Sequence, residues 1–175
     1  ISSYGSSALR VFINAIGDSD YVISNNNISN NTTEYAVNLY ANADSTYDTN
    51  MTFSNNLLKD NYMPASYGGP IGIHATGGGT VTISNNDIIS NQGGIIADAT
   101  GSTAETSQIN ITENTIHLGT GTAISINRRF GPSSPGTVSI TNNTFSENSG
   151  SSKLIYISPY GTVNPKGEIV FTNNN

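Results

Sequence analysis

The stretch that decides the fold is VTISNNDIISN, from Val81 to Asn91. Versions of this eleven-residue pattern return along the chain, and they begin at Tyr21, Met51, Val81, Ile109, Val138 and Ile169. By subtraction, successive copies start 30, 30, 28, 29 and 31 residues apart. A nearly fixed period of this length indicates a solenoid, because one such unit cannot bury its apolar side chains alone.

Apolar and polar residues alternate at the start of each copy. In the copy at Val81, the apolar residues Val81 and Ile83 alternate with Thr82 and Ser84. The first and third positions of the other copies are apolar or aromatic as well. Alternation with a period of two predicts a β-strand that buries one face.

An asparagine occupies the sixth position of every copy. These residues are Asn26, Asn56, Asn86, Asn114, Asn143 and Asn174. Asn accepts the left-handed backbone region, so we expect each of them to adopt it at a sharp bend, and stacked amides can bond to one another in a ladder. A partial second row, formed by Asn31, Asn61, Asn91 and Asn148 with Gly119 in the fourth unit, predicts another bend of the same kind.

Each unit contains two further strands. A short apolar segment, such as the one around Ile88, follows the asparagine bend. About ten residues later comes another apolar run, and these runs are Leu9–Asn14, Ala36–Tyr40, Pro70–His74, Gly94–Asp98, Ala123–Asn127 and Leu154–Ser158. The pattern therefore predicts three strands in each turn of the solenoid.

These rows resemble the repeats of right-handed parallel β-helices of the pectate-lyase-like kind. Such repeats occur in pectin-degrading enzymes, in bacterial surface proteins and in the adhesin-like proteins of methanogenic archaea. The resemblance covers nearly the whole chain and implies an all-β solenoid of about five to six turns. A β-sandwich is the alternative fold, but it does not explain the asparagine row.

Composition restricts the function classes. The chain has 175 residues, of which 10% are charged and none is Cys, and its formal net charge is −6. With only six basic residues and a negative net charge, the composition argues against nucleic-acid binding. No apolar run is long enough to span a membrane. The absence of Cys excludes disulfides and thiolate metal sites while allowing an extracellular location.

We expect residues 1–175 to form a single β-helix domain, as a segment of a longer repeat protein. Loops of variable length connect each first strand to the next second strand, and we expect them to stack on one side of the rod. Variable loops on a rigid scaffold are common positions for binding residues. The basic segment beginning at Arg128 and Arg129 and the aromatic segment around Tyr160 stand out among these loops.

The outward row at the end of the first strands supplies the candidate ligand-binding residues. In the predicted register this row contains Asn14, Tyr40, His74, Asp98, Asn127 and Ser158. Adjacent turns would bring His74 and Asp98 to roughly 5 Å from each other. The candidates for a ligand-binding face are therefore Tyr40, His74, Asp98, Asn127, Arg128, Arg129 and Tyr160.

The favoured function is an extracellular or cell-surface adhesin-like stalk or binding module, with a cell-surface glycan as its ligand. Tyr side chains stack on sugar rings and Arg pairs with carboxylates. A polysaccharide lyase or glycoside hydrolase is the alternative, although the row supplies a single carboxylate, Asp98. Binding of another cell-surface protein, or a filament of segments stacked end to end, also remains open. No catalytic residue, metal site or cofactor is predicted.

Overall fold

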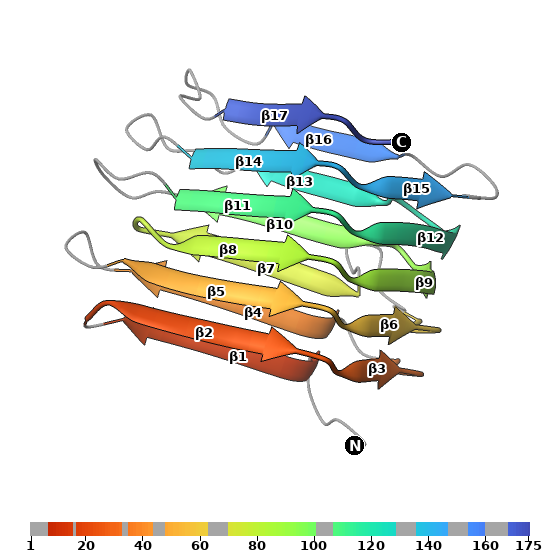
Figure 1. Ribbon diagram of the computed structural model, residues 1–175, viewed down its shortest axis with the longest axis horizontal. Coiled ribbons are helices and arrows are strands. Elements are labelled where there is room, and N and C mark those ends of the chain that lie inside the picture. The colour runs from red at the N-terminus through yellow and green to blue at the C-terminus, as the bar shows by residue number, and fades with distance from the viewer. Residues whose placement is uncertain are drawn as a thin grey trace.

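The computed structural model shows a coil of parallel strands whose turns stack on one another (Figure 1). It describes residues 7–15, 17–32, 35–43, 48–62, 70–100, 107–128, 136–146, 154–159 and 168–175. Within these ranges there are 17 strands, and no helix that could cross a membrane was found. The all-β prediction is confirmed.

The strands form three parallel sheets. In order across the first sheet they are β1 (Ser7–Ala15), β4 (Tyr35–Ala43), β7 (Ile71–Thr76), β10 (Ile95–Thr100), β13 (Ile124–Arg128) and β16 (Ile155–Pro159). In order across the second sheet they are β2 (Ser19–Ser24), β5 (Thr49–Ser54), β8 (Thr80–Ser84), β11 (Ser107–Thr112), β14 (Gly136–Thr141) and β17 (Glu168–Thr172). The third sheet contains β3 (Asn27–Ser29), β6 (Leu57–Lys59), β9 (Asp87–Gln92), β12 (Thr115–Thr120) and β15 (Thr144–Ser146).

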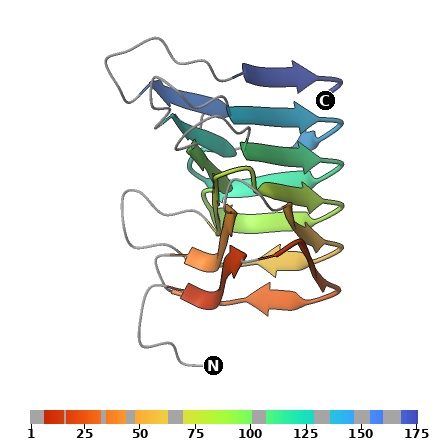
Figure 2. The ribbon, with the colours of Figure 1, turned by 90° about the vertical axis from the view of Figure 1, so that its left-hand side faces the viewer.

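Each turn contributes one strand to every sheet, and the turns stack in tiers (Figure 2). The sequence predicted five to six turns, but the coil has about four. This number counts only the turns that stack on a following turn in all three sheets. The third sheet has five strands, which gives four strand-to-strand steps. The prediction was too high because β16 and β17 have no following third-sheet strand within the described residues.

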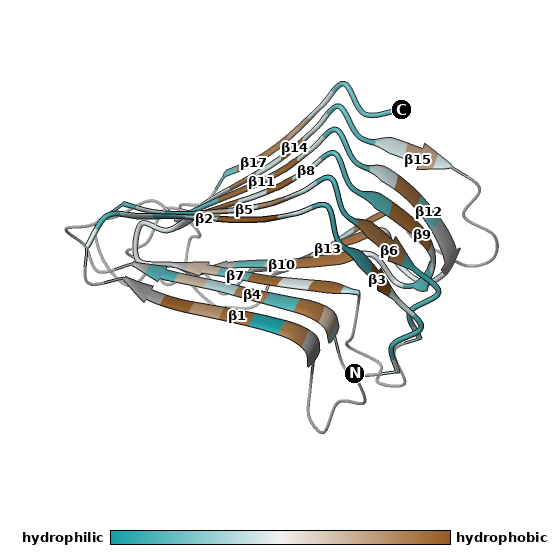
Figure 3. Cartoon of the chain, turned by 60° about the horizontal axis from the view of Figure 1, so that its bottom comes forward, coloured by the Kyte–Doolittle hydropathy of each residue, from teal (hydrophilic) through white to brown (hydrophobic). Residues whose placement is uncertain are grey.

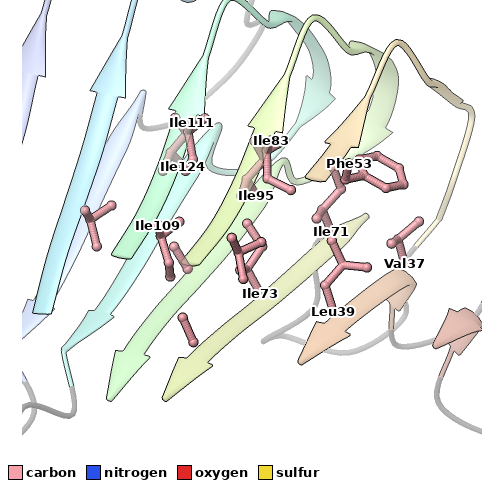
Figure 4. Packing of buried hydrophobic residues seen from close by; sticks show 14 of the residues in the cluster. Val37, Leu39, Phe53, Ile71, Ile73, Ile83, Ile95, Ile109, Ile111 and Ile124 are labelled. Carbon is pink, nitrogen blue, oxygen red and sulfur yellow. The ribbon is translucent and has the colours of Figure 1, made fainter. Parts of the chain in front are cut away.

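The core is a narrow column of aliphatic side chains enclosed by the three sheets (Figure 4). Val81 pairs with Met51 on one neighbouring turn and with Ile109 on the other, and all three are buried. The first sheet adds rows such as Leu39, Ile73 and Ala97 from the opposite side. Alternating hydropathy along the strands (Figure 3) leaves the intervening residues on the outside, which is the strand pattern that the sequence predicted.

The predicted asparagine ladder is present at the bend between the second and third sheets, where hydrophilic residues of successive turns lie in line (Figure 3). Asn56 donates from its backbone N and from Nδ2 to Oδ1 of Asn86, over 2.9 and 3.1 Å. Its Nδ2 also donates to the carbonyl oxygens of Ser54 and Ile23. Side-chain amides are bonded in this way from Asn26 through Asn174. The amides thereby satisfy backbone groups that the bend would otherwise leave unpaired.

The left-handed residue at this bend is not the one that the sequence predicted. Positive φ angles occur one position earlier, at Asn25, Asn55, Asn85, Glu113, Asn142 and Asn173. The ladder asparagine is therefore selected for its side-chain hydrogen bonds rather than for its backbone conformation. Glu113 adopts the same geometry with φ of 58° although Glu lacks the local bonding that makes this region accessible to Asn.

The second asparagine row is confirmed for three turns. Asn31 donates from Nδ2 to Oδ1 of Asn61, and Asn61 donates to Oδ1 of Asn91. Gly119 does not continue it, because Leu118 pairs with Asn91 and the register then shifts before Thr120. Asn148 lies outside the described residues.

Replacing a buried ladder residue should destabilise the fold. Asn86→Ala removes a side chain that is fully buried and that bonds to Asn114, Ser84 and Phe53. We expect the free energy of unfolding to fall by about 1–3 kcal/mol, as measured by chemical denaturation. Asn26→Ala at the exposed end of the row should cost less, and equal losses in the two variants would contradict the ladder's structural role.

Replacing Glu113, which adopts a left-handed backbone conformation, by a residue that tolerates this conformation should stabilise the fold. We expect Glu113→Asn to raise the free energy of unfolding by about 1 kcal/mol, since Asn tolerates positive φ better than Glu. Glu113→Gln is the matched control, because it removes the same charge without changing the backbone preference. If both variants gained equally in thermal denaturation, the effect would be electrostatic and not conformational.

Candidate functional site

The outer face of the first sheet carries a row of aromatic and ionisable side chains at successive turns. Strand register pairs Phe12 with Tyr40, Tyr40 with His74, and His74 with Asp98. These residues alternate along their strands with inward residues such as Leu39, Ile73 and Ala97, which are fully buried. The buried core therefore fixes the position of each side chain in the row. We call Phe12, Tyr40, His74 and Asp98 the first-sheet row.

Aromatic rings in the first-sheet row stack on one another. The ring centroids of Tyr40 and His74 lie 4.3 Å apart, with only 9° between the ring planes. On its other side, Tyr40 has the ring of Phe12 at 5.3 Å, tilted by 41°. The guanidinium carbon of Arg10 also lies 5.3 Å from the Tyr40 ring centroid. The broad faces of Tyr40 are thus occupied by protein groups, so its ring offers mainly its edge and hydroxyl to a ligand.

His74 and Asp98 form the polar end of this stack. Nδ1 of His74 lies 3.6 Å from Oδ2 of Asp98, which is an ion pair when the imidazole is protonated. The Asp98 side chain is only 11% exposed, against 25% for His74. Oδ1 of Asp98 has no hydrogen-bond partner among the described residues. A buried carboxylate oxygen without a donor favours a ligand or solvent group that supplies one.

The structure brings together three of the predicted site residues, Tyr40, His74 and Asp98. Asn127 and Arg128 lie in β13, where their backbones pair with Ser158 and Pro159, but their side chains are outside the described part. The pairing of β10 with β13 ends at Ala97 and Ile126, one residue before Asp98 and Asn127. Arg129 and Tyr160 lie outside the described residues altogether.

The first residue of the predicted row was wrong. Asn14 pairs with Asn42, and the partner of Tyr40 is Phe12. The cause is a two-residue error in the first strand, since Leu9 and not Val11 stacks on Val37. The sequence interpretation therefore missed Phe12 and Arg10. Aligning Leu9, Val11 and Ile13 with Val37, Leu39 and Ala41 would have revealed both.

The chemistry available here is hydrogen bonding and charge pairing. One carboxylate is too few for the pair of acidic residues that glycoside hydrolysis commonly uses. A search of the described residues found no group of three His, Cys, Asp or Glu side chains that could hold a metal ion. The polar groups that the described part of the row offers are a phenol hydroxyl, an imidazole and one carboxylate.

Removing the Asp98 carboxylate should have little effect on stability. Asp98→Ala loses the contact with His74 but also removes a charge that is buried with one oxygen unpaired. We expect these terms to offset each other, so that the free energy of unfolding changes by less than about 1 kcal/mol in urea titrations. A loss of several kcal/mol would show that Asp98 has a partner that holds the sheet together.

Comparison with known proteins agrees with the architecture. A family model described as the right handed beta helix region matches residues 3–175. No curated protein and no solved structure was found to match the chain. The match covers nearly all of the sequence and includes every strand of the three sheets. The chain therefore belongs to the right-handed beta helix family.

Proposed function

We propose that this chain is a glycan-binding module of an adhesin-like protein that is secreted or displayed on the cell surface. The observation that carries the proposal is the first-sheet row, in which Tyr40, His74 and Asp98 follow one another at successive turns. The family alone assigns no activity, since one fold supports many functions. The proposal therefore rests on what these side chains can recognise.

The spacing of the first-sheet row suits an extended polar chain. Successive turns are separated by roughly 4.8 Å, the ordinary distance between paired strands. A glycan lying along the solenoid axis would meet a hydroxyl, an imidazole and a carboxylate in sequence, and each of these bonds sugar hydroxyls. Arg10, above the Tyr40 ring, adds a cation at one end of the row.

Rigidity supports binding at this face. The inward residues Leu39, Ile73 and Ala97 beside Tyr40, His74 and Asp98 are fully buried, and parallel pairing continues from β1 through β10 with a regular register. Side chains held in this way lose little conformational freedom when a ligand binds. A binding row on a stiff coil also fits a stalk that presents it away from its attachment point.

The extracellular location is part of the proposal and is supported by composition. The chain contains no Cys, and only 10% of its residues are charged. The outer positions of the second sheet include Thr52, Thr82 and Ser139, which are neutral hydroxyl side chains. Such a surface is soluble without strong attraction to nucleic acid or to anionic lipid.

A polysaccharide lyase is a second candidate, favoured by the His74 and Asp98 pair, whereas a glycoside hydrolase commonly needs a second carboxylate that the row does not supply. An imidazole beside a carboxylate can accept and return a proton. The 3.6 Å separation of Nδ1 and Oδ2 is compatible with such a pair. An enzyme of this kind would cleave the glycan that it binds, so an assay for cleavage distinguishes it from a binding module.

Substitution of the polar end of the row should weaken glycan binding. We expect the chain to bind a subset of glycans on an array, and His74→Ala with Asp98→Ala to lower the affinity for them about tenfold or more. The reason is the loss of two polar partners, an imidazole and a carboxyl group. Release of reducing ends, or of unsaturated sugars, would be measured on each bound polysaccharide.

The matched control is Thr82→Ala with Ser139→Ala, which alters two outer positions on the second sheet and should leave affinity unchanged. Glycan capture by the wild-type chain without cleavage supports a binding module. Cleavage that disappears in the His74 and Asp98 variant would make the protein an enzyme. Absence of binding to every glycan, or equal binding by both double variants, would exclude the first-sheet row as the site.

A further inference from the structure

An open hollow of about 310 Å³ lies on the surface where strands of the third sheet end. The first-sheet row belongs to another sheet and does not line it. We call this hollow the third-sheet pocket. It is lined by Asp60, Asn61, Tyr62, Ser90, Asn91, Gln92 and Thr120. These residues come from three successive turns, because Asp60 to Tyr62 follow β6, Ser90 to Gln92 end β9, and Thr120 ends β12.

The third-sheet pocket lies beside a point where the coil loses its regularity. In the second and third turns, Asp60 and Ser90 adopt equivalent positive φ angles of 54° and 53°. In the fourth turn the register shifts between His117 and Leu118, and again between Leu118 and Thr120. The fourth turn therefore does not repeat the path of the two turns before it, and Thr120, which follows the shift, lines the pocket.

The backbone beside the third-sheet pocket is closely packed. A Cβ atom on Gly94 would collide with the carbonyl of Ala123, so no other residue fits there without a shift. Gly93 donates from its backbone N to the carbonyl oxygen of Thr120 over 2.7 Å, and Gln92 donates to that of Asn61 over 3.0 Å. These bonds hold the lining residues of adjacent turns at fixed separations. They set the backbone frame of the pocket, whereas the amide of Gln92, whose Oε1 is buried, must rotate to reach a ligand.

The lining combines an aromatic platform with polar groups. Tyr62 is 59% exposed, and neither ring contact recorded among the described aromatic pairs involves it. Oε1 of Gln92 is buried and has no hydrogen-bond partner among the described residues. The side chains of Asn61 and Asn91 form hydrogen bonds within the second asparagine row. The polar side chains that remain for a ligand are Gln92, Ser90, Thr120 and Asp60.

Charge narrows the ligand class. Among the residues that line the third-sheet pocket, Asp60 is the one charged side chain, and it is an anion. Nζ of Lys59 lies 3.8 Å from Oδ2 of Asp60, but Lys59 is not part of the lining. Phosphates, sulfates and uronic acids would thus meet a carboxylate with no cation in the lining to oppose it. Neutral molecules with several hydroxyl donors fit the exposed tyrosine and the two acceptors, Asp60 and Gln92.

We propose that the third-sheet pocket binds a neutral pyranose sugar, with the apolar face of the ring against Tyr62 and hydroxyl groups bonded to Gln92 and Asp60. Rotation about the last torsion of Gln92, which has a broad energy profile, lets its amide present either oxygen or nitrogen to the sugar. The inference deepens the proposed carbohydrate function, on which it rests, by adding a separate subsite. This subsite differs from the first-sheet row because it leaves one aromatic face open and offers no cation.

The experiment titrates the chain with the methyl glycosides of glucose, galactose, mannose and N-acetylglucosamine, and with methyl glucuronide as the acidic probe. Binding is followed by saturation-transfer NMR and by the chemical shifts of the tyrosine ring protons. We expect at least one neutral glycoside to bind and to perturb Tyr62, while methyl glucuronide does not. Tyr62→Ala and Gln92→Met should each weaken that binding about tenfold.

Gln92→Met keeps the length of the side chain and removes the unpaired oxygen, so the fold should be retained and loss of binding can be assigned to the lost amide. Tyr156→Ala, which removes an exposed tyrosine of β16, is the aromatic control and should bind normally. If the His74 and Asp98 double variant loses binding while Tyr62→Ala and Gln92→Met keep it, the sugar binds at the first-sheet row and this proposal is overturned. The proposal is also overturned if no neutral glycoside binds, or if methyl glucuronide binds as tightly.

Discussion

The structure depends on the amide bonding of the asparagine ladder. Each internal amide accepts two bonds from one neighbouring turn, and it donates to the other neighbouring turn and to carbonyls of the bend itself. Because both directions along the axis are used, a ladder residue cannot move without breaking bonds in adjacent turns. The bend between second and third sheets therefore keeps the same length throughout, and insertions accumulate in the other connections. A constant bend in turn keeps the apolar rows in register over the length of the coil.

The regular part of the fold was predictable because it repeats. The first and third positions of the pattern become core rows, and the sixth becomes the ladder, since any other phase would expose apolar side chains or leave amides unpaired. Where two neighbouring residues are both Asn, the sequence could not say which one adopts the left-handed conformation. The fourth turn resolves this, because Glu113 stands at the strained position and Asn114 remains in the ladder. The single turn with Glu in place of the first Asn therefore showed which position is left-handed, whereas the turns with two Asn residues could not.

The candidate sites were predictable only in part, and the reasons are physical. Stacking of His74 on Asp98 followed from strand register, which the apolar rows specify well. The orientation of the Tyr40 ring did not follow, since it depends on the neighbours on both sides, and one of those was misplaced by the two-residue error at Phe12. The burial of Asp98 was missed for a related reason, because alternation predicts which face a side chain occupies but not what covers it. The third-sheet pocket adjoins a register shift near Leu118, and a repeat pattern cannot predict where one turn departs from the repeat.

Stacking along a solenoid axis constrains what an aromatic row can bind. Rings at equivalent positions of successive turns are spaced closely enough to cover one another, as Tyr40 and His74 do at 4.3 Å. Such a row gains rigidity and loses the open faces on which sugar rings stack. An open aromatic face is available where a residue has no aromatic neighbour at the equivalent position, and Tyr62, whose counterpart in the next turn is Gln92, meets this condition. A ring without an aromatic neighbour at the equivalent position of the next turn can therefore stack on a ligand without disturbing the fold, whereas stacked rings such as Tyr40 and His74 are suited to hydrogen bonding by their edges.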